Sequence, residues 1–244
     1  MFLPVRMSCL APLAALALGC ISALPALAAD RPAVLPDSME QRVIACTSCH
    51  ANTGGADAFF PRISGKPAGY LVNQLINFRD GRRQYPLMTY MVENLPDAYL
   101  REIADYFSTQ HQPPPPVQPT NASQAVLERG QALVTRGDKA IGVPACIACH
   151  GERLTGVAPA IPGLAGLPRD YVNAQFGAWK NQTRRAHAPD CMADIANRLS
   201  LDDVAAISSW LGARPLPADA APATAAAVTR PLPLACGSSP DRAP

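Results

Sequence analysis

The sequence Cys46-Thr47-Ser48-Cys49-His50 returns later in the chain as Cys146-Ile147-Ala148-Cys149-His150, in the same pattern 100 residues on. Positions i, i+3 and i+4 share one face of a helix, so a single turn brings two thiols and an imidazole together. Two such cysteines followed directly by histidine are the attachment signature of c-type haem, in which the thiols bond the porphyrin and the imidazole faces the iron. Each copy therefore predicts one covalently held haem.

A Cys-x-x-Cys pair has other uses. In a four-cysteine zinc ribbon the two pairs lie about 15–20 residues apart, but 96 residues separate Cys49 from Cys146. A thioredoxin-like redox site needs a βαβ context, and we find no convincing strand in the sequence. A simple disulfide within each pair stays open in an oxidising compartment. Because the two motifs stand at equivalent points of a repeat, haem attachment at both is the favoured interpretation.

The sequence around the motifs repeats as well. Phe60–Gly65 returns as Ile161–Gly166 at an offset of 101 residues. Tyr70, Gln74 and Phe78 return at the same offset as Tyr171, Gln175 and Trp179. Met88, Leu95, Ile103 and Phe107 return at an offset of 104 as Met192, Leu199, Ile207 and Leu211. Small drifts of this kind are what loop insertions produce, so the chain is read as two tandem copies of one fold rather than a solenoid.

Each copy is predicted to be helical, which makes the fold class all-α. Residues 69–80 read as a helix closed by Gly81. Apolar residues at i, i+3, i+4 and i+7 predict an amphipathic helix in each copy, and Ser200 with Asp203 reads as the cap of the second one. The spaced residues are Leu100, Ile103, Ala104 and Phe107 in the first copy, and Val204, Ile207, Ser208 and Leu211 in the second. A unit of about 80–90 residues has a marginal core, so a large apolar cofactor would complete it.

Methionine is the expected sixth ligand of each iron, because methionine favours electron transfer whereas an open position favours gas binding or catalysis. In the second copy Met192 is the only methionine after Met91, and His187 is the competing ligand. In the first copy Met88 and Met91 compete. The repeat favours Met88, since it stands where Met192 stands in the second copy.

Prolines and arginines also repeat near the motifs. Pro61 and Pro162 follow their histidines by 11 and 12 residues. A backbone carbonyl there can accept the histidine Nδ1–H and fix the ring, and loop rigidity is the simpler alternative. Four arginines follow the middle helices, and they either pair with haem propionates, dock a partner or lie on a solvated face: Arg82, Arg83, Arg184 and Arg185.

Residues 1–29 have the pattern of a secretory signal peptide. Arg6 is the only charged residue before Asp30, an apolar run follows it, and residues 26–29 form an A-x-A type cleavage site. An uncleaved anchor or a lipoprotein signal cut before Cys20 are the alternatives. Export to the periplasm, with the signal removed, is the expected localisation.

The remaining chain divides by composition. We expect an N-terminal domain over residues 30–110, a Pro-rich linker over 111–122, a C-terminal domain over 123–213 and a mostly disordered Ala/Pro-rich tail over 214–244. Cys191 and Cys236 are left over by the motifs, and whether they pair stays open. The chain of 244 residues is 48% hydrophobic and 16% charged with a net charge of +2, which gives no basic footprint for nucleic acid.

The sequence resembles a dihaem class I cytochrome c, most closely the cytochrome c4 group. The stretches that carry the resemblance are both CxxCH motifs, residues 60–65, residues 70–75 and Met88–Met91. The resemblance spans about residues 40–212. It implies two small helical cytochrome domains related by pseudo-twofold symmetry, with haems facing across the domain interface. Three features depart from that group. The lead before the first motif is short, residues 37–45 against 122–135 in the second copy. The tail after residue 214 is foreign to the group, and Cys191 stands beside the expected ligand Met192.

The function expected from these features is electron transfer rather than catalysis. The resemblance implies a periplasmic carrier in a respiratory chain, delivering electrons for example to a terminal oxidase. The alternatives are a cytochrome subunit of a periplasmic or membrane-bound dehydrogenase and, with less support, a dihaem enzyme such as a peroxidase. Expected partners are redox proteins such as the oxidase, a cytochrome bc1 complex or a dehydrogenase, with peripheral membrane association left open. The expected haem-binding residues are Cys46, Cys49, His50, Met88, Cys146, Cys149, His150 and Met192.

Overall fold

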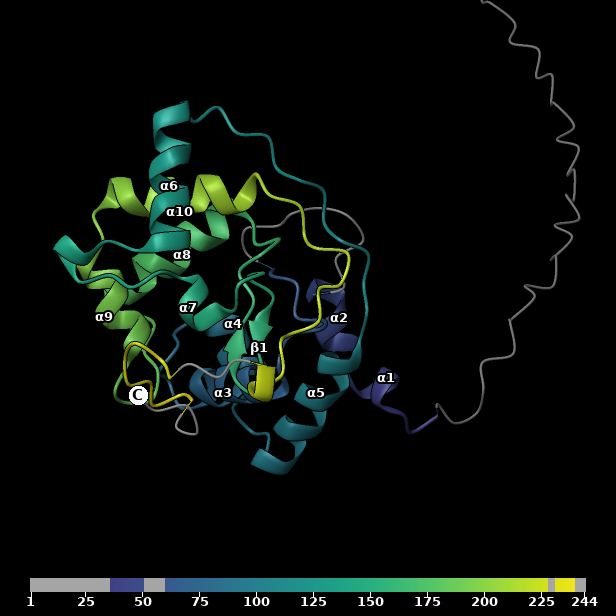
Figure 1. Cartoon of the computed structure of the whole chain (residues 1–244). Helices are drawn as coiled ribbons and strands as arrows, with labels where there is room; N and C mark the ends of the chain where they lie inside the picture. The colour runs from purple at the N-terminus through teal and green to yellow at the C-terminus, as the bar shows by residue number, and fades with distance from the viewer. Residues whose placement is uncertain (1–35, 51–59, 228–230, 240–244) are drawn as a thin grey trace, which may run out of the picture. The chain divides into compact units, whose positions relative to one another are not determined.

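Helices make up nearly all the regular structure in residues 36–50, 60–227 and 231–239, which are the residues that the computed structural model describes (Figure 1). The predicted signal peptide lies outside these residues. Both repeated halves belong to one unit, Asp37–Pro244. Within the described ranges, every helix falls short of the length and apolar character that a membrane crossing needs.

The first half contains the helices expected from the sequence. The helix predicted over residues 69–80 is α3, and the amphipathic helix predicted after it is α5. The four apolar residues at helical spacing on α5 are all buried, with at most 6% of their surface exposed, which confirms that this face packs into the core. The helices of this half are α1 (Met39–Arg42), α2 (Ile44–His50), α3 (Ala68–Arg79), α4 (Pro86–Val92) and α5 (Asp97–Thr109).

The second half repeats this order with a longer first helix. The cap predicted for its last helix is confirmed: the Ser200 hydroxyl accepts from the Asp203 amide at 3.0 Å, and the Asp203 carboxylate accepts from the Ser200 amide at 3.2 Å. The elements are α6 (Gln124–Arg136), η1 (Lys139–Ile141), α7 (Ile147–His150), β1 (Gly156–Val157), β2 (Ile161–Pro162), α8 (Arg169–Lys180), α9 (Cys191–Arg198), α10 (Leu201–Gly212) and η2 (Ala225–Ala227).

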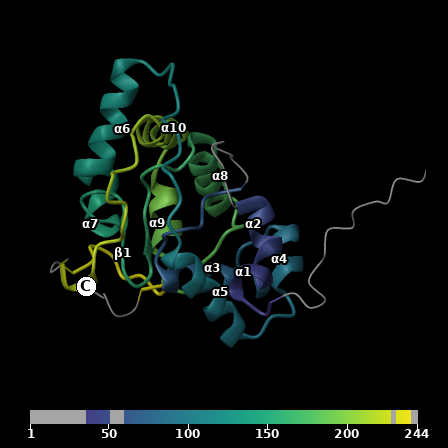
Figure 2. The same cartoon turned by 90° about the vertical axis from the view of Figure 1, so that its right-hand side faces the viewer.

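The lead segments of the two halves differ as expected. In the second half α6 lies across α10 in both views (Figures 1 and 2). The two helices approach closely at Gly130, where a Cβ would overlap the carbonyl of Ala206, so this position needs glycine. In the first half the corresponding position in the sequence holds only the four residues of α1, and fully buried Val43 follows them and packs with residues of α3 and α5.

A short hairpin in the second half was not expected. β1 and β2 pair antiparallel through Gly156 with Pro162 and Val157 with Ile161. Two residues are too few to show the alternation that identifies a strand in sequence. Val157 and Ile161 are buried against Leu232 of the tail, so the hairpin is covered by a segment far away in the chain.

The tail is also more ordered than its composition indicates. We expected residues 214–244 to be mostly disordered, but their described part packs on the second half. Ala223 pairs with the hairpin through two backbone hydrogen bonds of 2.8 and 2.9 Å, to Ala158 and Gly156. Leu232 is 3% exposed, and a disulfide joins Cys236 to Cys191. Extended pairing and a covalent link hold this segment, and neither produces a helical period.

The Pro-rich linker, residues 111–122, contains no helix or strand, as expected. It is tied to both halves. The Gln112 carbonyl accepts from the Arg62 guanidinium at 2.9 Å, and the Gln118 side chain accepts from the Arg169 amide at 2.8 Å. The Gln118 amide donates to the Gly212 carbonyl at 3.1 Å. The linker therefore lies against the protein rather than extending away from it.

Arg83 and Arg184 are equivalent in the repeat, and they face each other across the two halves. Their backbones form an antiparallel bridge. One backbone hydrogen bond flanks the bridge on either side, Gln84 to Thr183 and Arg185 to Arg82, each 2.7 Å long. The contact thus repeats itself about a local two-fold axis, in agreement with the symmetry that the family resemblance implies.

The two guanidinium groups share two glutamine acceptors. The Gln175 amide oxygen accepts from Arg83 at 2.8 Å and from Arg184 at 2.7 Å. The Gln74 amide oxygen accepts from the same two groups at 3.0 and 3.2 Å. Each guanidinium also lies over an aromatic ring of its own half, at 4.6 and 4.0 Å. Two cations are held together here by neutral acceptors and ring faces. Removing an acceptor would leave buried N–H donors of a charged group unpaired, which is costly in free energy.

Gln175→Leu would remove one acceptor from both guanidiniums at once. We expect it to lower the free energy of unfolding of the holoprotein by about 2 kcal/mol, because donors on charged groups are left unpaired. Denaturant titration followed by circular dichroism measures the change. The matched control is Gln124→Leu, on the exposed face of α6, which we expect to change stability by at most about 0.5 kcal/mol. Equal losses in the two variants would show that the glutamine does not support this contact.

Candidate functional site

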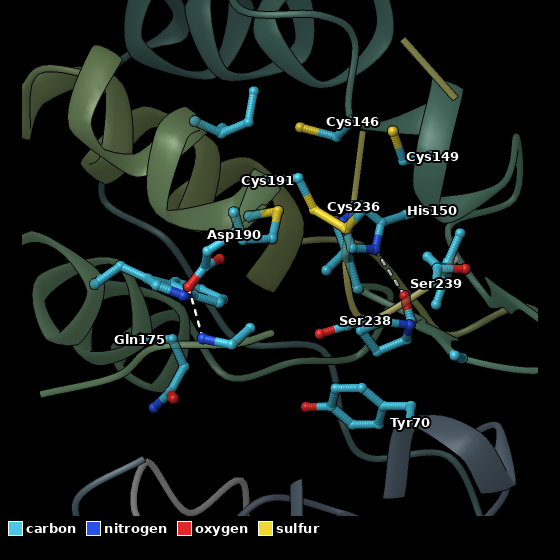
Figure 3. A pocket seen from close by; sticks show the side chains of 18 of the residues that line it. Tyr70, Cys146, Cys149, His150, Gln175, Asp190, Cys191, Cys236, Ser238 and Ser239 are labelled. Carbon is cyan, nitrogen blue, oxygen red and sulfur yellow. Dashed lines mark hydrogen bonds between the residues drawn. A yellow bond between two sulfur atoms is a disulfide. The ribbon is translucent and has the colours of Figure 1, made fainter. Parts of the chain in front are cut away.

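The second CxxCH motif forms one turn of helix at the wall of a cavity (Figure 3). Cys146 is the N-cap of α7 and His150 its last residue. The His150 ring is 6% exposed, and its Nδ1 lies 2.7 Å from the Pro162 carbonyl oxygen. A carbonyl can only accept, so Nδ1 carries the proton and Nε2 keeps its lone pair for a metal. Burial also lowers the pKa of His150, which favours the neutral ring that can bind a metal.

The cavity brings together the four predicted residues of this half. The cavity has a volume of about 180 Å³. Cys146, Cys149, His150 and Met192 all line it, whereas His187, the competing ligand, does not. Burial raises the pKa of the Cys146 thiol to about 12. The rest of the lining is largely apolar and includes Leu164, Leu167, Val172, Phe176, Trp179, Ile195, Ile207 and Leu211.

The first CxxCH motif has the same histidine geometry. His50 ends α2, and its Nδ1 lies 2.8 Å from the Pro61 carbonyl oxygen. The prediction that both repeated prolines accept from the motif histidines is therefore confirmed. Burial raises the pKa of Cys46 and lowers that of His50. Cys46 packs against the core between α3 and α5. Residues 51–59, between the histidine and the proline, lie outside the described part of the chain.

Met88 lies on α4, away from the cluster that holds Cys46. Both Met88 and its competitor Met91 pack against a neighbouring cluster formed by Phe78, Val92 and Leu100. The two clusters share residues of α3 and the loop before α5, namely Leu75, Ile76 and Leu95. Met88 and the motif thus belong to adjoining parts of one core, whereas Met192 and its motif line one cavity.

Cationic side chains gather at the cavity of the second half. Lys66, Arg184 and Arg185 line it, and Arg184 is 7% exposed. Burial lowers the pKa of both Lys66 and Arg184. Asp190 also lines the cavity, but backbone amides of Ala186 and Ala193 hold its carboxylate. The cations that remain suit an acidic group on a ligand, which is the propionate-pairing alternative for the repeated arginines.

The four repeated arginines do not share one role. Arg184 and Arg185 line the cavity, and Arg83 joins the contact between the halves. Arg82 instead bonds to Asp80 at 2.8 Å and to Asn77 at 2.8 Å on a half-exposed surface. The solvated-face alternative therefore describes Arg82 best.

Sequence reasoning missed part of the lining. Lys66, Tyr70 and Asn73 reach the second cavity from the first half, and the tail contributes residues on another side. Repetition of Tyr70 as Tyr171 was the available signal for the first group, and the unassigned pair Cys191 and Cys236 was the signal for the second. Two thiols and an imidazole on one turn, a thioether, an apolar wall and cations for acidic groups together fit a covalently attached haem.

Comparison with known proteins agrees with this chemistry. No protein-family model matches the chain. It is 36% identical over 174 residues to the thiosulfate dehydrogenase electron acceptor of Thiomonas intermedia, a match covering 70% of this chain and 79% of that protein. It is 34% identical over 175 residues to cytochrome c4 of Pseudomonas aeruginosa, covering 70% of this chain and 85% of that cytochrome.

Solved structures give the same result. The chain matches a thiosulfate dehydrogenase from Marichromatium purpuratum with a TM-score of 0.62 and 31% identity, over 70% of this chain but 36% of that longer one. It matches cytochrome c4 from Pseudomonas stutzeri with a TM-score of 0.58 and 28% identity, over 71% of this chain and 95% of that one. The chain therefore belongs to the cytochrome c4 family of dihaem class I cytochromes c, all-α electron-transfer proteins that carry two covalently bound haem groups.

Proposed function

We propose that this protein is a periplasmic carrier that takes electrons from a dehydrogenase and passes them into a respiratory chain, for example to a terminal oxidase. The observation that carries the proposal is the cavity that gathers Cys146, Cys149, His150 and Met192. An imidazole and a thioether as protein ligands would suit an iron that exchanges electrons rather than one that binds substrate. The signal-like residues 1–29 support the periplasmic location.

Eight side chains would hold the two haems. In the second half Cys146 and Cys149 would bond the porphyrin, and His150 and Met192 would supply the two protein ligands of the iron. In the first half Cys46, Cys49, His50 and Met88 take the same roles, with Met88 preferred to Met91 because it is the counterpart of Met192 in the repeat. Bound in this way, haem supplies a one-electron iron couple whose potential depends on the ligands and their burial. These assignments match the two domains that we propose for residues 30–110 and 123–213.

A dehydrogenase is the electron donor that the comparisons favour. One relative is named for accepting electrons from thiosulfate dehydrogenase, and one structural neighbour is such a dehydrogenase. We therefore propose a periplasmic thiosulfate-oxidising dehydrogenase as the donor. A role as its permanent subunit is the second candidate, since the neighbouring structure carries the matching part within a longer chain.

The ligand assignments predict how single variants behave. Met88→Ala and Met192→Ala should each remove about half of the methionine–iron charge-transfer band of the oxidised holoprotein, because each would take the thioether from one of two haems. Met91→Ala and His187→Ala are the matched controls, and we expect both to keep the full band. Optical spectra of the four purified proteins give the answer. A full band in Met88→Ala together with a lost band in Met91→Ala would reverse the assignment in the first half.

The donor is tested by reconstitution. Oxidised holoprotein mixed with a purified thiosulfate dehydrogenase and thiosulfate should have both haems reduced, whereas thiosulfate alone should reduce them far more slowly. Stopped-flow absorbance records both rates. Size-exclusion chromatography of the same mixture separates a carrier, which elutes alone, from a permanent subunit, which elutes with the enzyme. Reduction that is no faster with the dehydrogenase than without it would rule out this donor.

A further inference from the structure

We propose that tail residues 231–239 form part of the second haem site and that the Cys191–Cys236 disulfide positions Met192 there, which makes Cys236 a positioning residue for the sixth ligand. The inference rests on the proposed ligation by Met192. It assigns a role to a segment that has no counterpart in the first half of the repeat.

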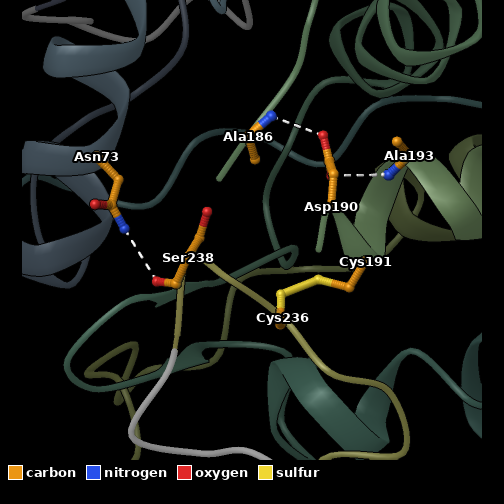
Figure 4. The surroundings of a disulfide bond; sticks show 7 residues. All are labelled: Asn73, Ala186, Asp190, Cys191, Ala193, Cys236 and Ser238. Atoms are coloured by element: carbon orange, nitrogen blue, oxygen red, sulfur yellow. Dashed lines mark hydrogen bonds between the residues drawn. A yellow bond between two sulfur atoms is a disulfide. The ribbon is translucent and has the colours of Figure 1, made fainter. Parts of the chain in front are cut away.

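The disulfide is attached to the residue that precedes Met192 in the chain, and Figure 4 shows the bond and its surroundings. Cys191 is the first residue of α9, and Met192 is the second. The bond joins Cys191 to a residue 45 positions later, with the two Cα atoms 5.0 Å apart. A cross-link at the first residue of an eight-residue helix restrains the backbone that carries Met192, at the end where helices fray most readily.

The tail also makes backbone contacts around the start of α9. The Gly237 amide donates to the Pro189 carbonyl at 2.9 Å. Gly237 lies so close to the carbonyls of His187 and Ala188 that a Cβ would overlap them, so this contact depends on glycine. On its other side the Ser238 carbonyl accepts from the Asn73 side chain at 3.1 Å. The two residues that directly follow the cysteine are thus held by contacts with both halves of the protein.

Asp190 completes this arrangement from the helix itself. Its carboxylate accepts from the Ala193 amide at 3.0 Å, which caps α9, and from the Ala186 amide at 2.6 Å, which holds the preceding loop. The capping residue and the cross-linked cysteine both precede Met192, and they act on the same turn of helix. The turn that presents the thioether is therefore restrained from the loop before it and from the tail beside it.

The same tail segment forms a wall of the cavity. Its residues at the lining are Leu232, Leu234, Cys236, Ser238 and Ser239, and Leu232 and Ser239 are 3% and 5% exposed. Figure 3 shows Cys236, Ser238 and Ser239 of this wall on the side of the cavity that holds the disulfide, and Met192 lines the same cavity. With haem bound, a wall that limits the access of water would disfavour the extra charge of the oxidised iron. Ligation by a firmly held thioether would raise the reduction potential as well.

The first half provides a comparison inside the same molecule. The residue before Met88 is Leu87, which is 48% exposed, where the second half has the cross-linked Cys191. The tail contacts described above are made with the second half and with Asn73 of α3. Loss of the disulfide should therefore change the second haem and leave the first as it is.

The test is the double variant Cys191→Ser/Cys236→Ser, matured as holoprotein, in which no unpaired thiol is left behind. We expect the methionine–iron charge-transfer band to weaken, by up to about half of its wild-type intensity, because Met192 would be held less firmly. The reduction potential of one haem should fall while that of the other is unchanged. The ferrous double variant should bind carbon monoxide at up to one haem per protein. Hydrogen exchange of the α9 amides should become faster, a readout that does not depend on the iron.

Asp219→Asn is the matched control. Asp219 is also a tail residue, but its 3.0 Å ion pair with Arg153 lies on the surface, with the two side chains 70% and 52% exposed. We expect wild-type spectra, potentials and carbon monoxide behaviour from it. If the double variant does not mature, Gly237→Ala tests the same contact between the tail and the start of α9 with the disulfide intact. The added Cβ would push the tail away from Ala188.

The outcomes distinguish the positioning role of the disulfide from the ligand role of Met192. Faster exchange in α9 with an unchanged band and unchanged potentials would overturn the inference, because the disulfide would then serve the fold and not the ligand. Met192→Ala with its full band would overturn the proposed ligand itself, and the positioning role with it. A weakened band in both Met192→Ala and the double variant, with the control unaffected, supports the proposal.

Discussion

The hydrogen bond from each motif histidine to a proline carbonyl is the interaction on which the two sites depend. At 2.8 Å in the first half and 2.7 Å in the second, it fixes which ring nitrogen carries the proton and leaves the other nitrogen able to bind iron. The helical turn that holds the two thiols can place an imidazole near a porphyrin, but the carbonyl decides its orientation. The loop that carries this proline is therefore as much a part of the site as the motif itself.

The two halves are joined by a contact between two residues that are equivalent in the repeat. Arg83 and Arg184 bring two positive charges together between neutral glutamine oxygens. Arg184 also lines the cavity of the second half, so the surface that unites the halves reaches the haem site. The same residues thus join the halves, and Arg184 places positive charge where the acidic groups of a bound haem would need it.

Much of this could be predicted from the sequence because the chain contains its own comparison. The repeat identified both motifs, favoured Met88 over Met91 and marked Pro61 and Pro162 as residues with a role. The helical spacing that ends at Phe107, and the cap at Ser200, depend on local periodicity and local hydrogen bonds, and the structure confirms both. Features that are repeated or local leave a clear trace in a single sequence.

The tail and the hairpin could not be predicted for the opposite reason. Each is held by a partner far away in the chain: Val157 by Ala223 and Leu232, and Cys236 by Cys191. An alanine- and proline-rich segment has no period to reveal such packing, and the pairing of cysteines cannot be read from their positions. Lys66 and Tyr70 of the first half line the cavity of the second half, and this too could not be predicted, since it arises only when the two copies pack together.

Mass spectrometry of proteolytic peptides from the mature holoprotein tests the central claim most directly. The peptide containing Cys46, Cys49 and His50 and the peptide containing Cys146, Cys149 and His150 should each carry the added mass of one haem, attached through both thiols. Bare masses for these peptides, after maturation in a host that attaches c-type haem, would contradict the account.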